Sequence, residues 1–309
     1  MLIYLVRRIV FGAAVLVGTS LITFLIAFVV PADPAIAMAG AKADPQTLAS
    51  IRRELRLDQP LYVQYSRYVE RAVRGDLGRS YIRRENVTRL IADRLPATAI
   101  LAASAMAVSL ILGIAMGALA AAYRGRATDN LLLVISLALV SVPVFWLGTM
   151  LLIAVAATMR SFPLGGYSGA ASLVLPTITL ALGSAGYYSR VLHTSLSDAF
   201  DQDYVRTARG KGLSPARVML RHAMANALLP LVTLAGLDLA GLLSGVVLTE
   251  TVFNWPGIGR LAAEAIFNLD IPVIMGTVLF SAFLIVVINL LVDLLYAYLD
   301  PRIRLAESA

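Results

Sequence analysis

Long apolar stretches alternate with polar segments along the whole chain. Six of them, which we place at 9–30, 98–123, 131–158, 171–190, 227–249 and 272–296, each contain about 20 residues or more. At a rise of about 1.5 Å per residue, a helix of this length crosses a hydrocarbon core of roughly 30 Å. The pattern therefore predicts an all-α membrane protein with six transmembrane helices.

The composition supports this class. Hydrophobic residues make up 59% of the 309 residues and charged residues 15%, against roughly 25% in an ordinary globular protein. The absence of Cys excludes disulfides, thiolate metal sites and Cys nucleophiles, and the two His, His193 and His222, are expected to be packing or surface residues. In a membrane protein, basic residues mainly determine which loops stay in the cytoplasm, so the formal charge of +7 does not indicate nucleic-acid binding. We expect a protein that contacts lipid, no nucleic acid and no metal, without a catalytic centre.

The first apolar stretch sets the orientation. Arg7 and Arg8 precede it, and Ala-Ile-Ala follows at 35–37, as in a cleavable signal peptide. The stretch is longer than the roughly 7–15 apolar residues of an ordinary signal peptide, so we expect 1–30 to be a retained transmembrane anchor. With a cytoplasmic N-terminus, most basic residues of the short loops lie inside, as the positive-inside rule requires. The C-terminal tail, 300–309, is then cytoplasmic too.

Residues 31–97 are predicted to form a small extracytoplasmic helical cap. Their 12 basic residues do not overturn this side, because the positive-inside rule weakens for loops longer than about 60 residues. Asp44 and Pro45 predict the start of one helix, and Pro60 and Gly75 bound a second. The shared faces are formed by Leu48, Ile51 and Leu55, and by Tyr62, Tyr65, Tyr68 and Val69. The tyrosines either pack the cap onto the membrane region or contact a docking partner.

Small residues and proline mark packing within the apolar stretches. Gly113 and Gly117, and likewise Gly241 and Gly245, lie one helical turn apart and would allow two helix backbones to approach closely. Pro143 is expected to kink the third stretch, because it removes a helical hydrogen bond that neighbouring groups must replace.

The longest predicted cytoplasmic loop, 190–226, contains the polar sequence DYVRTARGKGLSP at 203–215. Its basic residues serve either as retention charge at the membrane surface or as a contact for a partner. The GKG sequence lacks the remainder of a phosphate-binding loop, so no nucleotide site is predicted in this chain.

The same polar sequence predicts two short helices with a corner between them. Asp203 lies at the start of the first helix and basic residues lie near its end, as the helix macrodipole favours. Gly210 and Gly212 can end this helix, and Ser214 and Pro215 can serve as N-cap and first residue of a second one that reaches about residue 227. Both helices are expected to stand in water between two spans.

Three motifs in this order resemble the integral membrane subunits of ABC importers, most closely the dipeptide, oligopeptide and nickel branch. The loop is similar over YVRTARGKGLSPARVMLRHAMANALLP, the cap over LDQPLYVQYSRYV and GDLGRS, and the segment after the fifth stretch over LTETVFNWPGIGRL. The cap is similar to that of the B-type subunit, one of the branch's two paired permeases. Arg206, Thr207 and Ala208 replace the general Glu-Ala-Ala triplet, so only the alanine before Gly212 matches the wider importer pattern.

The resemblance implies a type I importer permease fold in a bacterial plasma membrane, with a five-helix core at 98–299. It also implies three kinds of partner: a second homologous permease subunit, two cytosolic ABC ATPase subunits that bind ATP and Mg, and an extracytoplasmic substrate-binding protein resting on the cap and on 250–271. This chain would hold no cofactor. The polar loop would be the coupling helix seated in an ATPase groove, through Tyr204, Arg206, Thr207, Ala208, Arg209, Lys211, Gly212, Leu213, Ser214 and Pro215.

Few residues of the apolar stretches are suited to contact a solute. Asp238 lies near the centre of the fifth stretch, where the branch usually has an uncharged residue. It is expected to line the pathway, to pair across a subunit interface, or to be tolerated in water or in protonated form. The resemblance places a gate near Ser244, Glu250, Asn254 and Trp255, although a Trp there is also typical of an interfacial anchor.

The function indicated is that of a permease subunit of an ATP-driven importer for dipeptides or oligopeptides, which is not itself an enzyme. Nickel, glutathione and haem importers of the same branch are alternatives for the solute. A self-sufficient ion-coupled transporter that uses Asp238 is the alternative from another class.

Overall fold

The computed structural model describes residues 2–29, 35, 44–54, 58–156, 158, 163 and 165–299. This part of the chain is helical, apart from an isolated antiparallel bridge between Arg79 and Asn86 and the connecting turns. It falls into two compact units. The first contains Met1–Thr98, Leu243–Thr251 and Pro256–Val287, and the second contains Ala99–Leu242, Val252–Trp255 and Ile288–Ala309.

Five helices in the described ranges are long and apolar enough to cross a membrane, and a bent pair supplies a sixth if it forms one span. The predicted all-α class is therefore confirmed, with five or six of the predicted spans among the described residues. The five are α1 (Leu2–Val29), α5 (Val87–Ala122), α8 (Ala170–Phe200), the continuous helix Pro215–Leu243 and α14 (Ile271–Leu299).

The bent pair is the third predicted span. It consists of α6 (Ala127–Ser141) and α7 (Val144–Leu151), which continues in a π-helical turn at Leu152–Ala156. The break at Val142 and Pro143 bends the pair by 94°. The predicted kink at Pro143 is confirmed, and its angle is large enough to make two separate helices.

Three helices have ends that differ from those of the predicted spans. α5 begins at Val87 rather than near 98, and α8 continues to Phe200 rather than ending near 190. The added turns carry polar residues, so an apolar pattern does not detect them. The fifth span ends at Leu243 rather than near 249, because Gly245 adopts a φ of +100° before the short α12 (Val247–Val252) begins.

The first unit is held by a core between the start of α5, α13 (Ile258–Phe267) and the start of α14. Its buried members are Val87, Leu90, Ile91, Ile258, Leu261, Ala265 and Val273. Residues of three segments that are far apart in the sequence thus share one apolar cluster, which fixes the position of the loop that precedes α5.

The cap contains two described helices, α3 (Pro45–Glu54) and α4 (Leu61–Val73). Asp44 caps α3, because its Oδ1 accepts hydrogen bonds from the backbone N–H groups of Gln46 and Thr47, both at 2.9 Å. Pro60 precedes α4, and Gly75, with a φ of +80°, follows it. Both predicted helices are confirmed. Leu55 of the predicted apolar face lies outside the described residues.

The tyrosines of α4 mainly pack the cap against α1 and α14. The Tyr65 ring lies 5.3 Å from that of Phe24 on α1, and its hydroxyl lies 3.0 Å from Ser20 Oγ. The Tyr68 hydroxyl donates to the Met275 carbonyl at 3.4 Å, and burial raises the pKa of Tyr68 to about 12. Tyr62 differs, because 75% of it is exposed. It is the tyrosine of this stripe that remains available to a partner.

The second unit is built on close packing between α5 and α8. A Cβ added at Gly113 would lie 2.6 Å from Tyr188 Cβ, and one at Gly117 would lie 2.6 Å from the Ser189 carbonyl oxygen. The predicted close approach at this glycine pair is confirmed. Gly241 differs, since an added Cβ there meets nothing within 4 Å.

Replacing Gly117 with Ala should destabilise the chain by about 1–3 kcal/mol, because the new methyl group must displace the backbone of α8. The matched change Gly241→Ala should be neutral or slightly stabilising, since Ala favours a helix over Gly. Thermal unfolding of the two variants in detergent measures the difference. Equal melting temperatures would show that α5 and α8 do not pack at Gly117.

Candidate functional sites

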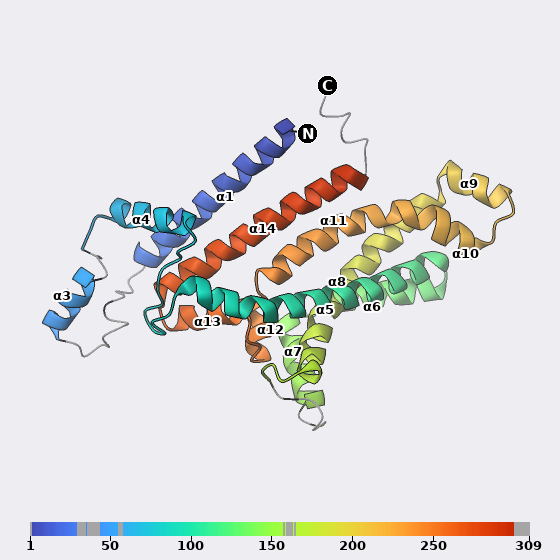
Figure 1. The fold of residues 1–309 in the computed structure, drawn as a ribbon. Helices are drawn as coiled ribbons and strands as arrows, with labels where there is room; N and C mark the ends of the chain where they lie inside the picture. Colours follow the sequence, from blue (N-terminus) through green and yellow to red (C-terminus); the bar gives the residue numbers. More distant parts are fainter. Residues whose placement is uncertain are drawn as a thin grey trace. The chain divides into compact units, whose positions relative to one another are not determined.

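The polar loop forms the predicted helical corner. α9 (Asp203–Gly210) follows α8, and α10 (Pro215–Val218) begins after a turn in which Gly212 has a φ of +76°. Figure 1 shows α9 and α10 together at one end of α8. Ser214 is the N-cap by backbone position, and its carbonyl accepts from the Val218 N–H at 3.0 Å. The Ser214 hydroxyl makes no capping bond.

The second helix does not stop near residue 227 as predicted. α10 continues through a π-helical turn at Met219–Ala223 into α11 (Met224–Leu243). The loop therefore connects two long helices directly, and the backbone is helical without a break from Pro215 to Leu243.

One face of α9 packs into the second unit. Val205 and Ala208 are buried, and fully burying a valine side chain contributes about 1.5–3 kcal/mol. Their cluster also contains Ala121, Leu192, Leu196, Ala199, Val218, Ala223, Met224 and Ala227, with Leu213 packed against it. Of the predicted partner-contacting residues, Ala208 and Leu213 thus hold the segment in place, and Ala208 is not available on the surface.

The opposite face of α9 and its turn are exposed. These residues are Tyr204, Arg206, Thr207, Arg209, Lys211, Gly212, Ser214 and Pro215. Arg206 pairs with Asp203 at 3.2 Å, and the Arg209 guanidinium lies 5.6 Å from the centre of the Phe200 ring. Exposed ion pairs of this kind contribute about 0–1 kcal/mol, so these cations can exchange their partners at small cost.

Asp129 and His193 form a contact that the sequence patterns did not indicate. His193 Nε2 lies 3.0 Å from Asp129 Oδ1, and both side chains are largely buried. Asp129 Oδ2 also accepts from the Gly125 N–H at 2.8 Å. The contact joins the first turn of α6 to α8, which confirms the packing role expected for His193. Asp129 escaped notice because an Asp in a polar turn is usually solvated.

Asp238 lies on α11, five residues before its end at Leu243, and not at the centre of a span as predicted. Its Oδ2 accepts a hydrogen bond of 2.6 Å from the Tyr188 hydroxyl on α8. The carboxylate is partly exposed, whereas Tyr188 is fully buried. The structure thus provides a partner for Asp238 within the chain itself.

Glu250 was predicted to lie at a gate, but it is fully buried. Its Oε1 accepts from the Thr98 hydroxyl at 3.0 Å, and its Oε2 accepts from the Arg260 N–H at 2.8 Å. A Cβ added at Gly257 would collide with the carboxylate, so glycine is required there. Burial raises the pKa of Glu250, while the Arg260 and Thr98 donors oppose that shift by stabilising the charged form. Glu250 therefore organises the connection between α12 and α13.

The other predicted gate residues have different surroundings. Trp255 is fully buried with its ring 4.8 Å from that of Tyr167, so it is not an exposed interfacial anchor. Asn254 is exposed and has a φ of +50°. The Ser281 hydroxyl donates to the Ser244 carbonyl at 2.9 Å, which joins the segment after α11 to α14. Asn254 is the member of this set that a solute or partner can reach directly.

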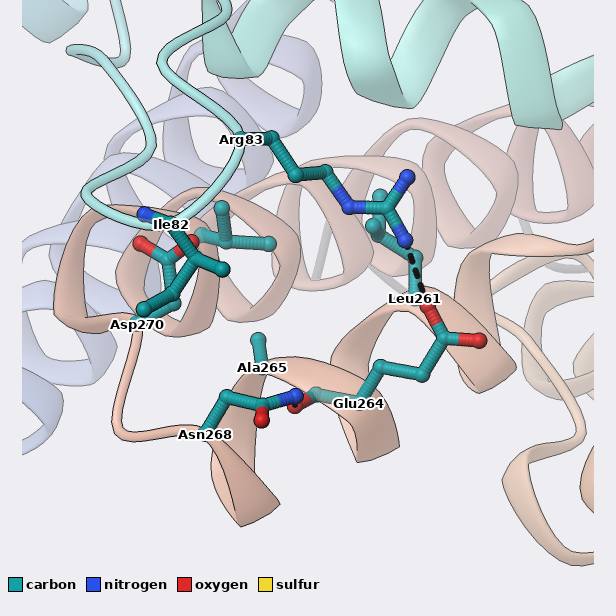
Figure 2. Close-up of a pocket in the computed structure, with 8 residues that line it drawn as sticks. Ile82, Arg83, Leu261, Glu264, Ala265, Asn268 and Asp270 are labelled. Atoms are coloured by element: carbon teal, nitrogen blue, oxygen red, sulfur yellow. Dashed lines mark hydrogen bonds and ion pairs between the residues drawn. The ribbon is translucent and has the colours of Figure 1, made fainter.

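A small cavity of about 100 Å³ lies between the loop before α5 and α13 (Figure 2). Arg83 reaches across it to Glu264 at 2.7 Å, and Asp270 accepts from the Tyr81 N–H at 3.0 Å and from the Ser80 hydroxyl. These bonds hold the loop before α5 against α13 and the residues that follow it within the first unit. The cavity is too small for a peptide.

The fold and the polar corner together define a class of protein. The chain is a multi-pass helical membrane protein with a rigid polar helical corner between two of its spans. Among the described residues, no group of three or more His, Cys, Asp or Glu side chains is arranged to hold a metal ion. The exposed basic face of the corner suits contact with a protein in water.

The comparisons with known proteins identify the family. The model of the binding-protein-dependent transport system inner membrane component matches residues 113–305, and the model of its N-terminal region matches 1–102. The chain belongs to this family of transport permeases, whose importers work with ATPase and substrate-binding subunits.

Two curated relatives cover almost the whole chain. A protein of Brucella abortus (strain 2308), whose name assigns it to a peptide transport system as a permease, is 41% identical over 97% of this chain and 98% of its own length. The glutathione transport system permease protein GsiC of Escherichia coli (strain K12) is 38% identical over 98% of this chain and 99% of its own length.

Solved structures show the same fold. A chain of the MetNI methionine ABC transporter, in an inward-facing conformation, aligns with a TM-score of 0.57 at 17% identity, over 68% of this chain and 96% of the solved one. An amino acid ABC transporter solved with histidines aligns with a TM-score of 0.51 at 16% identity, over 70% and 94% of the two chains. The type I importer permease fold implied by the motifs is confirmed.

Replacing Glu250 with Ala should lower the melting temperature strongly, because each buried donor left unpaired costs about 1–3 kcal/mol. The control is Thr251→Ala on the same helix, where the side chain is exposed and bonds only to the Val247 carbonyl. Thermal unfolding in detergent compares the two. A Glu250→Ala variant as stable as Thr251→Ala would contradict a stabilising role of the buried hydrogen bonds around Glu250.

Proposed function

We propose that this chain is the permease subunit of an ATP-driven importer of dipeptides, oligopeptides or closely related solutes, in a bacterial plasma membrane. Family membership and the names of the relatives support this role. The observation that carries it is the construction of α9: an apolar face locked into the second unit and a basic face exposed to solvent. This arrangement is suited to receive force from a soluble protein and pass it to α8 and α11.

The proposed complex contains this chain, a second homologous permease, two cytosolic ATPase subunits and an extracytoplasmic substrate-binding protein. The ATPases bind ATP and Mg, and this chain supplies no catalytic group. Both termini and α9 lie on the cytoplasmic side, and the cap lies outside. The binding protein delivers the solute to the cap and to the segment containing Asn254. When the ATPases close on ATP, α9 moves together with the ATPase groove in which it is seated.

The movement of α9 reaches the spans through the buried cluster around Val205 and Ala208. Close-packed protein cores have low compressibility, so they transmit a displacement rather than absorb it. α8 enters the cluster through Leu192 and Leu196, and the helix Pro215–Leu243 enters it through Val218 and Ala227. Both helices that flank the loop therefore follow α9, which suits an alternating-access mechanism.

A self-sufficient transporter is the competing function, and Asp238 is the observation that favours it. An intramembrane acid is a common proton or cation site in such proteins. That alternative predicts solute uptake by this chain and its paired permease with no ATPase present. The importer requires the ATPase for every cycle.

The test reverses charge on the exposed face of α9. The double variant Arg206→Glu and Lys211→Glu should retain the fold, because neither side chain is buried. It should co-purify with much less ATPase, because the reversed charges lose their ion pairs with acidic residues of the ATPase and are repelled by them. We expect at least a tenfold decrease in bound ATPase per permease. The matched control is Arg52→Glu with Arg53→Glu on α3, which should retain the ATPase. Undiminished binding by the α9 variant, or solute uptake without any ATPase, would refute the proposed function.

A further inference from the structure

Asp238 and Tyr188 form an oriented carboxylate within the membrane-spanning part of the second unit. The Tyr188 hydroxyl donates to Asp238 Oδ2 at 2.6 Å and lies 3.7 Å from Met106 Sδ. The ring is confined, because Tyr188 is fully buried and its Cβ faces Gly113, where α5 and α8 approach closely. One carboxylate oxygen is thus fixed by a rigid donor from a different helix.

The second oxygen of this carboxylate is unpaired among the residues that the structure describes. Within the described ranges, Asp238 Oδ1 has no hydrogen bond or ion pair. An ionised Asp within a membrane span is costly, so it normally faces protein or a water-filled cavity. A single hydrogen bond to a charged group returns about 1.5–3 kcal/mol. The remaining oxygen is available to a cation.

The side of α11 next to Asp238 is open. Gly241 lies one turn further along the same face, and a Cβ added there would meet nothing within 4 Å. Leu237, beside Asp238, is 49% exposed. A small group can therefore approach the carboxylate from outside this chain, across a stretch of bare backbone.

The geometry selects the kind of cation. An Arg guanidinium prefers to engage both oxygens of a carboxylate at once, and the Tyr188 hydroxyl already takes one acceptor position on Oδ2, which restricts that approach. An ammonium group is a compact charge that can bind through a single oxygen. The open oxygen is therefore better matched to an ammonium than to a guanidinium from a neighbouring subunit.

We propose that Asp238, positioned by Tyr188, binds the primary ammonium group of the transported solute during its passage. The inference rests on the proposed function, because it assigns a solute contact inside that importer. It adds a chemical class: solutes with a free amino group, such as peptides with an unmodified N-terminus or a Lys side chain. Tyr188 is a positioning residue, since it acts through Asp238.

The experiment measures initial uptake of a Gly-rich dipeptide with a free N-terminus by the complete complex with its binding protein. Wild type and Asp238→Asn are compared at pH 6.5 and at pH 9, on either side of the α-amino pKa of about 7.7–8.0. The ratio of the two rates at each pH cancels the response of the binding protein, which is identical in both samples. Asp198→Asn, an exposed change of the same chemistry on α8, is the control.

We expect Asp238→Asn to lower uptake at least tenfold at pH 6.5, and the ratio of wild type to variant to fall toward one at pH 9, where the solute amine is neutral. Asp238→Glu should retain part of the activity. Tyr188→Phe should lower uptake severalfold with the same pH trend. Asp198→Asn should match wild type. A peptide that carries a Lys side chain and an acetylated N-terminus should keep a high ratio at pH 9 if the Lys ammonium binds.

Two results would overturn the inference. Uptake by Asp238→Asn that equals wild type at both pH values would show that the acid makes no solute contact. For the dipeptide, whose only amine is the N-terminus, a ratio that is high and independent of pH would indicate a structural role or a permanent cation from another subunit. ATPase co-purification, measured on the same samples, separates these outcomes from failure of the proposed function: it should be unchanged in every Asp238 variant.

Discussion

The apolar contact beneath α9 is the constraint on which the rest of the arrangement depends. Val205 and Ala208 are buried against side chains from α5, α8 and the helix Pro215–Leu243, so a short polar helix in water becomes part of the membrane-spanning unit. An eight-residue helix would be marginal in isolation. Tertiary packing makes it rigid, and its rigidity allows its exposed basic face to act as a defined surface. The glycine turn at Gly212 then returns the chain directly into the next long helix.

A second constraint explains where the helices break. Backbone groups within a bilayer must be satisfied by the protein, so non-helical turns occur where other groups replace the lost bonds. The turn after α12, which lies beyond the end of the span at Leu243, shows the same compensation, because the buried Glu250 carboxylate accepts from the Arg260 N–H. Close helix contacts at Gly113 and Gly117 have a different role, because they bring α5 onto α8 where both helices are continuous.

Much of the architecture could be predicted from local pattern. Apolar length indicated the spans, Asp44 indicated the cap of α3, and Pro143 indicated the break between α6 and α7. The helix bounds at Val87 and Phe200 could not be found, because those turns are polar and are held by tertiary contacts. Burial was also hidden: Glu250 and Trp255 look like surface groups in a polar segment, yet both are enclosed. The Asp129–His193 and Tyr188–Asp238 contacts join residues far apart in the sequence, so no spacing rule reveals them. The roles of the exposed α9 residues stay a prediction.

The absence of Cys from the chain makes the central claim directly measurable, since one introduced cysteine has no competitor. Thr207, exposed at the centre of α9, is the suitable position. A membrane-impermeant maleimide should label Thr207→Cys in inside-out vesicles stripped of ATPase, should fail to label it in intact cells, and should be excluded once purified ATPase subunits rebind. Labelling of the residue in intact cells, or labelling that the rebound ATPase does not reduce, would contradict a cytoplasmic helix seated in the ATPase.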